Sequence, residues 1–320
     1  MKIAVLKGTR RFDVEEVPVP DIQPDEVLVE VSACGVCASE LDMWNGLGFN
    51  DYPLYLGHEV SGSVRAIGAE VTSVAVGEPV AVWVTTRGYA EFVAVRAEYC
   101  RPAGEAPLDS ALAEPLACAA NAVEKADVRL GDDVVLVGAG FMGNLVQQLV
   151  NLRGARQVIV ADTRADALVR AAEQGATRTV DVTVESLSDV VTDLTDGRGA
   201  DVTFECTGSP AALEVLGDVT RMSGKLVLVG FHQGPPRSIP LGYWNWMAFD
   251  IVNAHFRDVA TIMRGMTIGS RLLAAGRVSL EPLVTHRFGI ESINEAFRTA
   301  FEKPPGFIKA TVVMGEPSEG

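Results

Sequence analysis

The stretch DDVVLVGAGFMGNLVQQLVNLRGARQVIVAD (residues 132–162) decides the fold of this chain. It opens with an apolar run that is typical of a buried strand and continues with Gly138, Gly140 and Gly143. Apolar residues at helical spacing follow, and a second apolar run, residues 157–161, ends on Asp162. Strand, glycine turn, helix and strand in this order predict a βαβ unit.

The glycines and the acid of this unit each have a physical reason. Gly138 permits a tight turn, Gly140 lets a ligand approach the backbone, and Gly143 lets helix and strand pack closely. The first turn of the helix then offers N–H groups and a positive dipole end to a pyrophosphate. Asp162 follows Gly143 by 19 residues, near the spacing of about 20 at which an acid binds the adenosine ribose. The pattern predicts a dinucleotide site.

The charge of Asp162 also bears on which dinucleotide binds there. A carboxylate repels a 2′-phosphate, so this residue favours NAD over NADP. Arg164 would offset part of that repulsion because it lies only two residues later.

Length and composition are those of an ordinary globular protein: 320 residues, 48% hydrophobic and 22% charged, enough for two domains. A net charge of -15 argues against a nucleic-acid partner or a membrane surface, because both need clustered Lys and Arg. No apolar run suits a signal peptide or a membrane span. Five cysteines, an odd number, fit reduced thiols better than disulfides. We therefore predict a cytoplasmic protein.

Two domains are expected from the order of the predicted elements. Residues 1–118 contain short Val-rich strands between Pro and Gly turns. Residues 119–257 alternate strands and helices, which predicts a doubly wound parallel sheet. Residues 258–320 are too few to form a domain, so we expect them to complete the first one. The predicted fold class is α/β, with a β domain and a dinucleotide-binding domain.

Two short stretches of the first domain carry residue types that a β scaffold does not need. They are CGVCASELDMWNG (residues 34–46) and LGHEVSG (residues 56–62), and the groups to explain are Cys37, His58 and Glu59. A thiolate, an imidazole and a carboxylate are ligand types of an open catalytic zinc site.

The chain resembles the medium-chain, zinc-dependent alcohol and polyol dehydrogenase family over essentially its full length. The motifs that carry the resemblance occur in the order of the family: GVCASE (35–40), GHEVSGSVRAIG (57–68), VGEPVAV (76–82), GYAEF (88–92), AEPLA (113–117), GAGFMG (138–143) and THRFGIESINEAF (285–297). This resemblance implies a GroES-like β domain, a Rossmann domain and one catalytic zinc. The second, structural zinc lobe of the family has no counterpart here.

The resemblance also assigns candidate metal ligands. Cys37 and His58 match zinc ligands, and Glu59 matches the acid that lies in or near the first coordination shell. Glu114 matches the third ligand of the polyol, glucose and threonine dehydrogenase branches, and Cys118 is a competing thiolate. Cys34 forms a CxxC with Cys37, but its place in a β domain favours a structural role over a redox role.

The family's proton relay maps onto Ser39, with a turn-capping role as the alternative, and onto Asp42, where many relatives have a histidine. Glu40 stands where an Asp is usual and Ala38 where a Gly is usual, which leaves the geometry of the relay open. Val229 matches a position near the nicotinamide. Lys309 matches a basic residue at the cofactor phosphate, with a solvated surface lysine as the alternative. The predicted cofactor-binding residues are Gly138, Gly140, Phe141, Met142, Gly143, Asp162, Val229 and Lys309.

The resulting prediction is an NAD-dependent, zinc-dependent oxidoreductase that acts on a secondary alcohol of a polyol, sugar or cyclitol. The alternatives are a zinc-free NAD(P)H-dependent quinone or enoyl reductase of the same fold and a nucleotide-binding sensor without catalysis. The resemblance implies a homo-oligomer, a dimer or a tetramer. Residues 230–258 are the least family-like part, and we expect their aromatic residues to serve packing rather than recognition.

Overall fold

The computed structural model describes residues 1–47 and 51–315. The chain forms two compact units, one of Met1–Ala117 with Met263–Gly320 and one of Cys118–Ile262. The sequence-based prediction divides the chain after residues 118 and 257 instead. No helix within the described ranges is long and apolar enough to cross a membrane.

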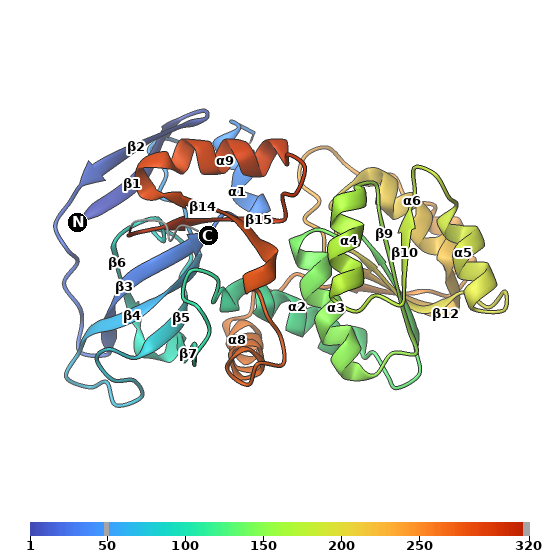
Figure 1. Cartoon of the computed structure of the whole chain (residues 1–320), viewed down its shortest axis with the longest axis horizontal. Helices are drawn as coiled ribbons and strands as arrows, with labels where there is room; N and C mark the ends of the chain where they lie inside the picture. Colours follow the sequence, from blue (N-terminus) through green and yellow to red (C-terminus); the bar gives the residue numbers. More distant parts are fainter. Residues whose placement is uncertain (48–50, 316–320) are drawn as a thin grey trace. The chain divides into compact units, whose positions relative to one another are not determined.

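The first unit is built on a seven-stranded sheet and a β-hairpin (Figure 1). Its sheet order is β14-β15-β3-β4-β5-β7, with β6 paired to β3. Alternate residues of β3 are buried, as a strand with one face on a core requires. The elements of this unit before the C-terminal segment are β1 (Lys2–Gly8), β2 (Arg11–Glu16), β3 (Glu26–Gly35), α1 (Ala38–Trp44), β4 (Glu59–Ile67), β5 (Pro79–Trp83), β6 (Phe92–Arg96), η1 (Ala97–Tyr99) and β7 (Cys100–Pro102).

The C-terminal segment completes the sheet of the first unit. Strand β15 pairs antiparallel with β3, so that Thr311 faces Gly35, and β14 runs parallel to β15. Phe297 of α9 is buried against the rings of Phe12, Trp44 and Tyr89. The elements of this segment are α8 (Val259–Ala274), η2 (Glu281–Leu283), β14 (Val284–Gly289), η3 (Ile290–Ser292), α9 (Ile293–Glu302) and β15 (Lys309–Val313).

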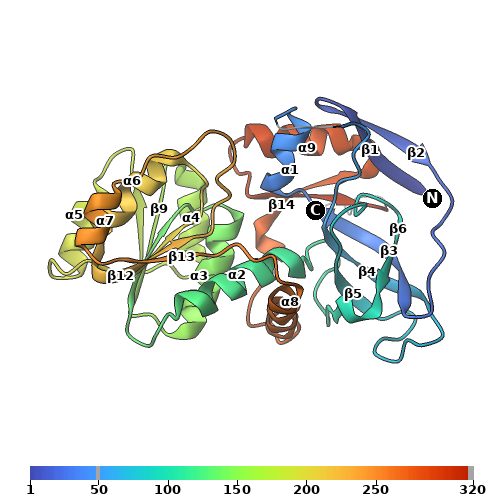
Figure 2. The ribbon, with the colours of Figure 1, turned by 180° about the vertical axis from the view of Figure 1, so that it is seen from behind.

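The second unit is a parallel sheet with helices between its strands (Figure 2). The sheet order β10-β9-β8-β11-β12-β13 is that of a doubly wound dinucleotide fold, which confirms the predicted α/β class. Helix α2 (Ala113–Ala126) leads into this unit. Its elements are β8 (Asp133–Val137), α3 (Phe141–Arg153), β9 (Gln157–Asp162), α4 (Ala165–Glu173), β10 (Arg178–Asp181), α5 (Leu187–Leu194), β11 (Ala200–Glu205), α6 (Pro210–Val219), β12 (Thr220–Leu228), α7 (Leu241–Trp246) and β13 (Asp250–Asn253).

Candidate metal centre and dinucleotide loop

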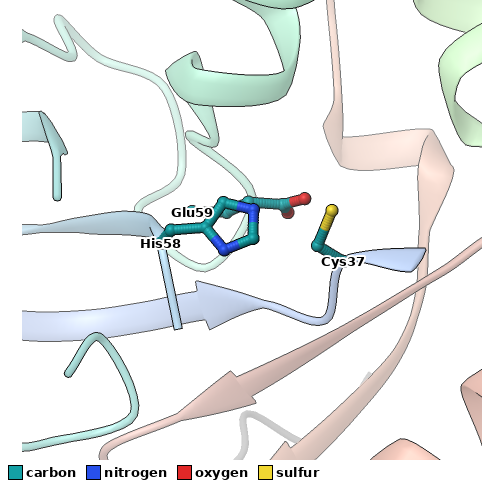
Figure 3. Close-up of side chains that lie close together, drawn as sticks. All are labelled: Cys37, His58 and Glu59. Carbon is teal, nitrogen blue, oxygen red and sulfur yellow. The ribbon is translucent and has the colours of Figure 1, made fainter. Parts of the chain in front are cut away.

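Cys37, His58 and Glu59 come together at one end of the β3 and β4 pair. Cys37 is the N-cap of α1, just after β3, and His58 directly precedes β4. The register pairs Gly35 with Glu59, so both chain segments reach the same edge. One potential ligand atom from each of the three residues lies within 4.8 Å of the others. Figure 3 shows the Glu59 carboxylate and the Cys37 thiol beside the imidazole ring of His58.

A glycine on the neighbouring strand makes room for the Glu59 carboxylate. A Cβ atom at Gly35 would lie 2.0 Å from Glu59 Oε2, so any side chain there would force the Glu59 carboxylate to move. Glu59 is only 1% exposed. Gly35 on β3 therefore leaves the space that the buried Glu59 carboxylate of β4 occupies.

The imidazole of His58 is oriented by Glu40 from the first turn of α1. His58 Nδ1 lies 2.9 Å from Glu40 Oε1, and the Gly57 N–H donates to the same oxygen at 2.7 Å. The Tyr89 hydroxyl donates to Glu40 Oε2 at 2.7 Å. With Nδ1 held in this way, Nε2 is the ring nitrogen that remains for a metal. A carboxylate that fixes a ligand histidine through its other nitrogen is common at zinc sites.

The same contacts shift the pKa values of both groups. Burial alone would raise the pKa of Glu40, but His58, Tyr89 and the Gly57 N–H hold it below its usual value. Burial would lower the pKa of His58, but Glu40 and Cys37 raise it well above the usual range. The Glu40 carboxylate is therefore kept charged although it is buried.

Lys309 at the start of β15 contacts Glu59 from the other side. Its Nζ lies 2.8 Å from Oε1 and 2.6 Å from Oε2, and both side chains are buried. Burial would lower the pKa of Lys309, but Glu59, Cys37 and Glu114 raise it above its usual value. The alternative of a solvated surface lysine is therefore wrong. The contact of Lys309 with a cofactor phosphate stays a prediction.

The donor set fits a single zinc ion. Thiolate, imidazole and carboxylate are the three ligand classes that zinc takes from proteins, and three protein ligands leave one position for substrate. Cys37, His58 and Glu59 are the group that the described residues bring together for this purpose. Glu114 is outside that group, although its charge acts on Lys309. Cys118 lies one turn after Glu114 on α2 and is partly buried.

The residues of the predicted relay lie on α1. Ser39 donates a hydrogen bond to the Cys37 sulfur at 3.2 Å. Asp42 follows three residues later on the same helix and is partly buried. Cys34 is fully buried and its pKa is raised well above the usual value by that burial, which suits the structural role predicted for it.

The glycine turn of the second unit has the close packing that the sequence predicts. Gly138 has a φ of +110°, a conformation that favours glycine. A Cβ at Gly143 would lie 1.9 Å from the Gly138 carbonyl oxygen, whereas a Cβ at Gly140 would have no neighbour within 4 Å. Gly140 is the N-cap of α3 and makes no side-chain cap. Phe141 and Met142 form the first turn of that helix.

Asp162 ends β9 beside this turn. Its Oδ2 accepts the Ala139 N–H at 2.7 Å, and its Oδ1 accepts the Arg164 N–H at 2.9 Å. The Arg164 Nε lies 3.7 Å from the same carboxylate. The predicted ribose-binding acid thus also holds the backbone of the glycine turn.

Val229 directly follows β12 and is buried. Its N–H and that of Gly230 both donate to the Glu205 carbonyl oxygen at 2.9 Å. The Glu205 carboxylate, also fully buried, accepts from the Thr207 N–H at 2.6 Å and lies 2.8 Å from His232 Nε2. Glu205, the last residue of β11, thus binds the two residues that follow β12 through its carbonyl oxygen and His232 through its carboxylate.

The aromatic residues of segment 230–258 differ in burial. Trp244 is buried in the hydrophobic core of the second unit, while Trp246 is 78% exposed. His255 Nε2 lies 3.1 Å from the Gly230 carbonyl oxygen. Trp244 therefore serves packing, whereas the packing role expected for Trp246 stays a prediction.

Sequence reasoning missed three buried residues whose side chains fix a functional region: Glu40 and Tyr89 at the metal centre, and Glu205 at the ends of β11 and β12. Glu40 lies within the GVCASE motif, and its carboxylate next to a ligand cysteine is a signal that could have identified it. Tyr89 lies within GYAEF, and Glu205 ends β11. A buried residue that binds through its side chain leaves no periodic pattern, and no signal in a single sequence marks Tyr89.

Known proteins resemble this chain over most of its length. Residues 23–128 match the model of the alcohol dehydrogenase GroES-like domain, and residues 142–267 match that of the zinc-binding dehydrogenases. The sorbitol dehydrogenase of Gallus gallus is 31% identical, with 89% of each chain covered. That of Bacillus subtilis (strain 168) is 28% identical over 94% of each chain. Galactitol-1-phosphate dehydrogenase from Escherichia coli superposes with a TM-score of 0.85 at 25% identity, covering 98% of this chain and all of that one. The chain therefore belongs to the medium-chain, zinc-dependent alcohol and polyol dehydrogenase family, and is an oxidoreductase with zinc and NAD as its cofactors.

Proposed function

We propose that Cys37, His58 and Glu59 hold the catalytic zinc, and that the enzyme oxidises a secondary alcohol of a polyol, sugar or cyclitol with NAD. The observation that carries this proposal is that one ligand atom of each of the three residues lies within 4.8 Å of the others. One of these residues, His58, is oriented by Glu40. Relatives named sorbitol dehydrogenase support the polyol class. A glutamate at position 114, as in the polyol branches, supports it further.

When bound, zinc supplies a Lewis acid for the substrate hydroxyl and NAD a hydride acceptor. Ser39 lies beside Cys37 and donates its own proton to that sulfur, so its oxygen lone pairs can accept a hydrogen bond from a substrate hydroxyl. Asp42, three residues later on α1, is the next proton acceptor. In this relay the Ser39 hydroxyl turns from the Cys37 sulfur, accepts the substrate proton on its oxygen and gives its own proton to the Asp42 carboxylate. Asp42 then releases that proton to solvent.

For the third protein ligand, the geometry favours Glu59 over Glu114. Glu59 belongs to the group of three converging residues, whereas Glu114 is outside it. The charge of Glu114 instead helps to raise the pKa of Lys309, the partner of Glu59. Zinc per chain in Glu59→Gln and Glu114→Gln separates the two, since replacement of a direct ligand causes the larger loss of metal.

The first experiment is zinc per chain by elemental analysis, on the unmodified protein and Cys37→Ser prepared without added metal. We expect a value near one that falls towards zero in the variant. The unmodified protein is then screened with NAD against acyclic polyols, sugars and cyclitols by NADH absorbance. A value near zero in folded, NAD-binding protein would contradict the zinc site. A loaded protein inactive on every polyhydroxy alcohol would contradict only the substrate class.

We also propose a homo-oligomer of two or four copies and a cytoplasmic location. Strand β13 is an edge of the second unit's sheet, and Ile251 on it is 43% exposed. Trp246 on the preceding helix is exposed as well. An open edge with apolar side chains pairs readily with the same edge of a second copy. Light scattering of the unmodified protein and Ile251→Lys tests this, and an unmodified monomer would contradict it.

The proposed cytoplasmic location is supported by the cysteines. The five cysteines are free thiols, the form that a reducing compartment maintains.

A further inference from the structure

Asn144 is a fully buried amide in the first turn of α3, next to the glycine turn. Its Nδ2 donates to the carbonyl oxygens of Ala139 at 2.7 Å and Gly140 at 2.9 Å. We propose that Asn144 is a positioning residue for the cofactor, which fixes the backbone donors that bind the NAD pyrophosphate. This proposal rests on the NAD site described above.

The geometry of the peptide bond connects these hydrogen bonds to the cofactor. In a planar trans peptide, the C=O of one residue and the N–H of the next point in opposite directions. When Asn144 draws the carbonyls of Ala139 and Gly140 towards itself, the N–H groups of Gly140 and Phe141 turn away from it. These two residues are among those predicted to bind the cofactor, and N–H groups at a helix start suit a pyrophosphate.

The turn is held from its other side as well. Asp162 accepts the Ala139 N–H, and the Gly138 N–H donates to the Ala161 carbonyl oxygen at 2.7 Å. Ala139 is therefore bound through its N–H by β9 and through its C=O by α3. A loop fixed in this way before the ligand arrives loses less conformational freedom on binding.

Stability alone does not explain an asparagine at this place. Its neighbours Leu145 and Val146 are fully buried, and Asn144 Oδ1 has no hydrogen-bond partner among the described residues. A buried, half-satisfied amide costs free energy relative to an apolar side chain of similar volume. What Asn144 provides that an apolar side chain cannot is the pair of hydrogen bonds to the glycine turn.

Gln147, one turn later on the same helix, provides a matched control. It is also fully buried, and its Oε1 likewise has no partner among the described residues. Its Nε2 donates to the Ala171 carbonyl oxygen of α4 at 2.7 Å, so it joins two helices and does not touch the glycine turn. Both amides contribute to packing, but only Asn144 holds the turn.

The test measures dissociation constants of the full-length protein for NADH, ADP-ribose and adenosine by calorimetry or fluorescence, with melting temperatures. The variants are Asn144→Leu, Asn144→Ser and Gln147→Met. We expect Asn144→Leu to weaken NADH and ADP-ribose by about tenfold or more, since two hydrogen bonds are lost. Asn144→Ser can still donate to the Gly140 carbonyl four residues back, so its NADH affinity should lie between those of the unmodified protein and Asn144→Leu. This second variant keeps the test valid if Asn144→Leu folds poorly. Gln147→Met and the binding of adenosine, which lacks the pyrophosphate, stay within about twofold of the unmodified protein.

Three results would overturn the proposal. Unchanged NADH binding in folded Asn144→Leu or Asn144→Ser is the first. An equal loss in Gln147→Met is the second, because any buried amide would then have the same effect. A loss of adenosine affinity equal to the loss of NADH affinity is the third, because the defect would then not lie at the pyrophosphate. An unmodified protein that fails to bind NADH would instead overturn the cofactor assignment, and this proposal with it.

Discussion

Lys309 Nζ lies within 2.8 Å of both carboxylate oxygens of Glu59, although 250 residues separate the two in the chain. The contact joins the C-terminal strand β15 to the candidate metal centre on β4. Both side chains are buried, so the pair is shielded from water. The last strand of the chain thereby supplies the cation that pairs with a buried carboxylate on β4.

Removing Lys309 should be strongly destabilising. In Lys309→Met the Glu59 carboxylate stays buried without its partner, and we expect a loss of roughly 3 to 5 kcal/mol in the free energy of unfolding. The measurement is urea unfolding of metal-free protein. Lys309→Met combined with Glu59→Gln should recover most of the loss. Lys2→Met, which breaks an exposed pair with Glu291, should change the stability little, because water screens that pair. Equal losses in the two lysine variants would disprove the role of burial.

Replacing Glu40 should weaken metal binding without removing a ligand. Glu40→Gln loses the charge that holds His58 Nδ1, and partners of this kind change metal affinity by about 10- to 100-fold. Competition with a chelator measures the effect. Tyr89→Phe removes the hydroxyl that contacts the same carboxylate at 2.7 Å and the Gly35 carbonyl oxygen at 3.0 Å. It leaves the charge of Glu40 in place and should change the affinity much less. Unaltered zinc affinity in Glu40→Gln would show that His58 needs no support from this residue.

Much of the fold follows from local patterns, and so does part of the candidate site. The apolar periodicities around residues 132–162 and the alternation after them predict the parallel sheet that the structure contains. Residue types alone select Cys37, His58 and Glu59, which the structure brings together. Ligand chemistry is visible in a sequence when the residue types are unusual for their surroundings.

The partners of these residues could not be predicted in the same way. Glu40 and Tyr89 are 49 residues apart, and Lys309 and Glu59 are 250 apart, so no local spacing connects them. Helix α1 has seven residues and α7 has six, too few for a helical period to appear. Contacts of this kind arise from the topology of the sheet, which places β15 beside β3.

Two glycines of the same turn should respond to alanine in opposite ways. Gly143→Ala places a Cβ 1.9 Å from the Gly138 carbonyl oxygen, so α3 must move from the strand and the melting temperature should fall. Gly140→Ala meets no protein atom within 4 Å and should melt normally, yet bind NADH at least about tenfold more weakly because the Cβ points at the ligand's approach. Normal melting with normal NADH affinity in Gly140→Ala would mean that the pyrophosphate lies elsewhere.

The acid sensitivity of the second unit should depend on Asp201. Partial burial alone would raise its pKa, but Arg198, the Asp133 N–H and Arg221 hold it well below the usual value. A carboxyl group with a depressed pKa stabilises the fold above its unfolded pKa of about 3.9, and that stabilisation is lost as the pH falls towards the folded value.

We therefore expect Asp201→Asn to melt at a lower temperature than the unmodified protein at pH 7. The difference should begin to narrow as the pH falls below about 4, because the unfolded chain then takes up a proton at this position while the folded carboxyl group still does not. Melting curves across this range provide the measurement. Asp13→Asn, which breaks an exposed pair with Arg11, should change the melting temperature little at any pH. A difference for Asp201→Asn that stays constant from pH 7 to 3 would show that the side chain acts through its shape and not through its charge.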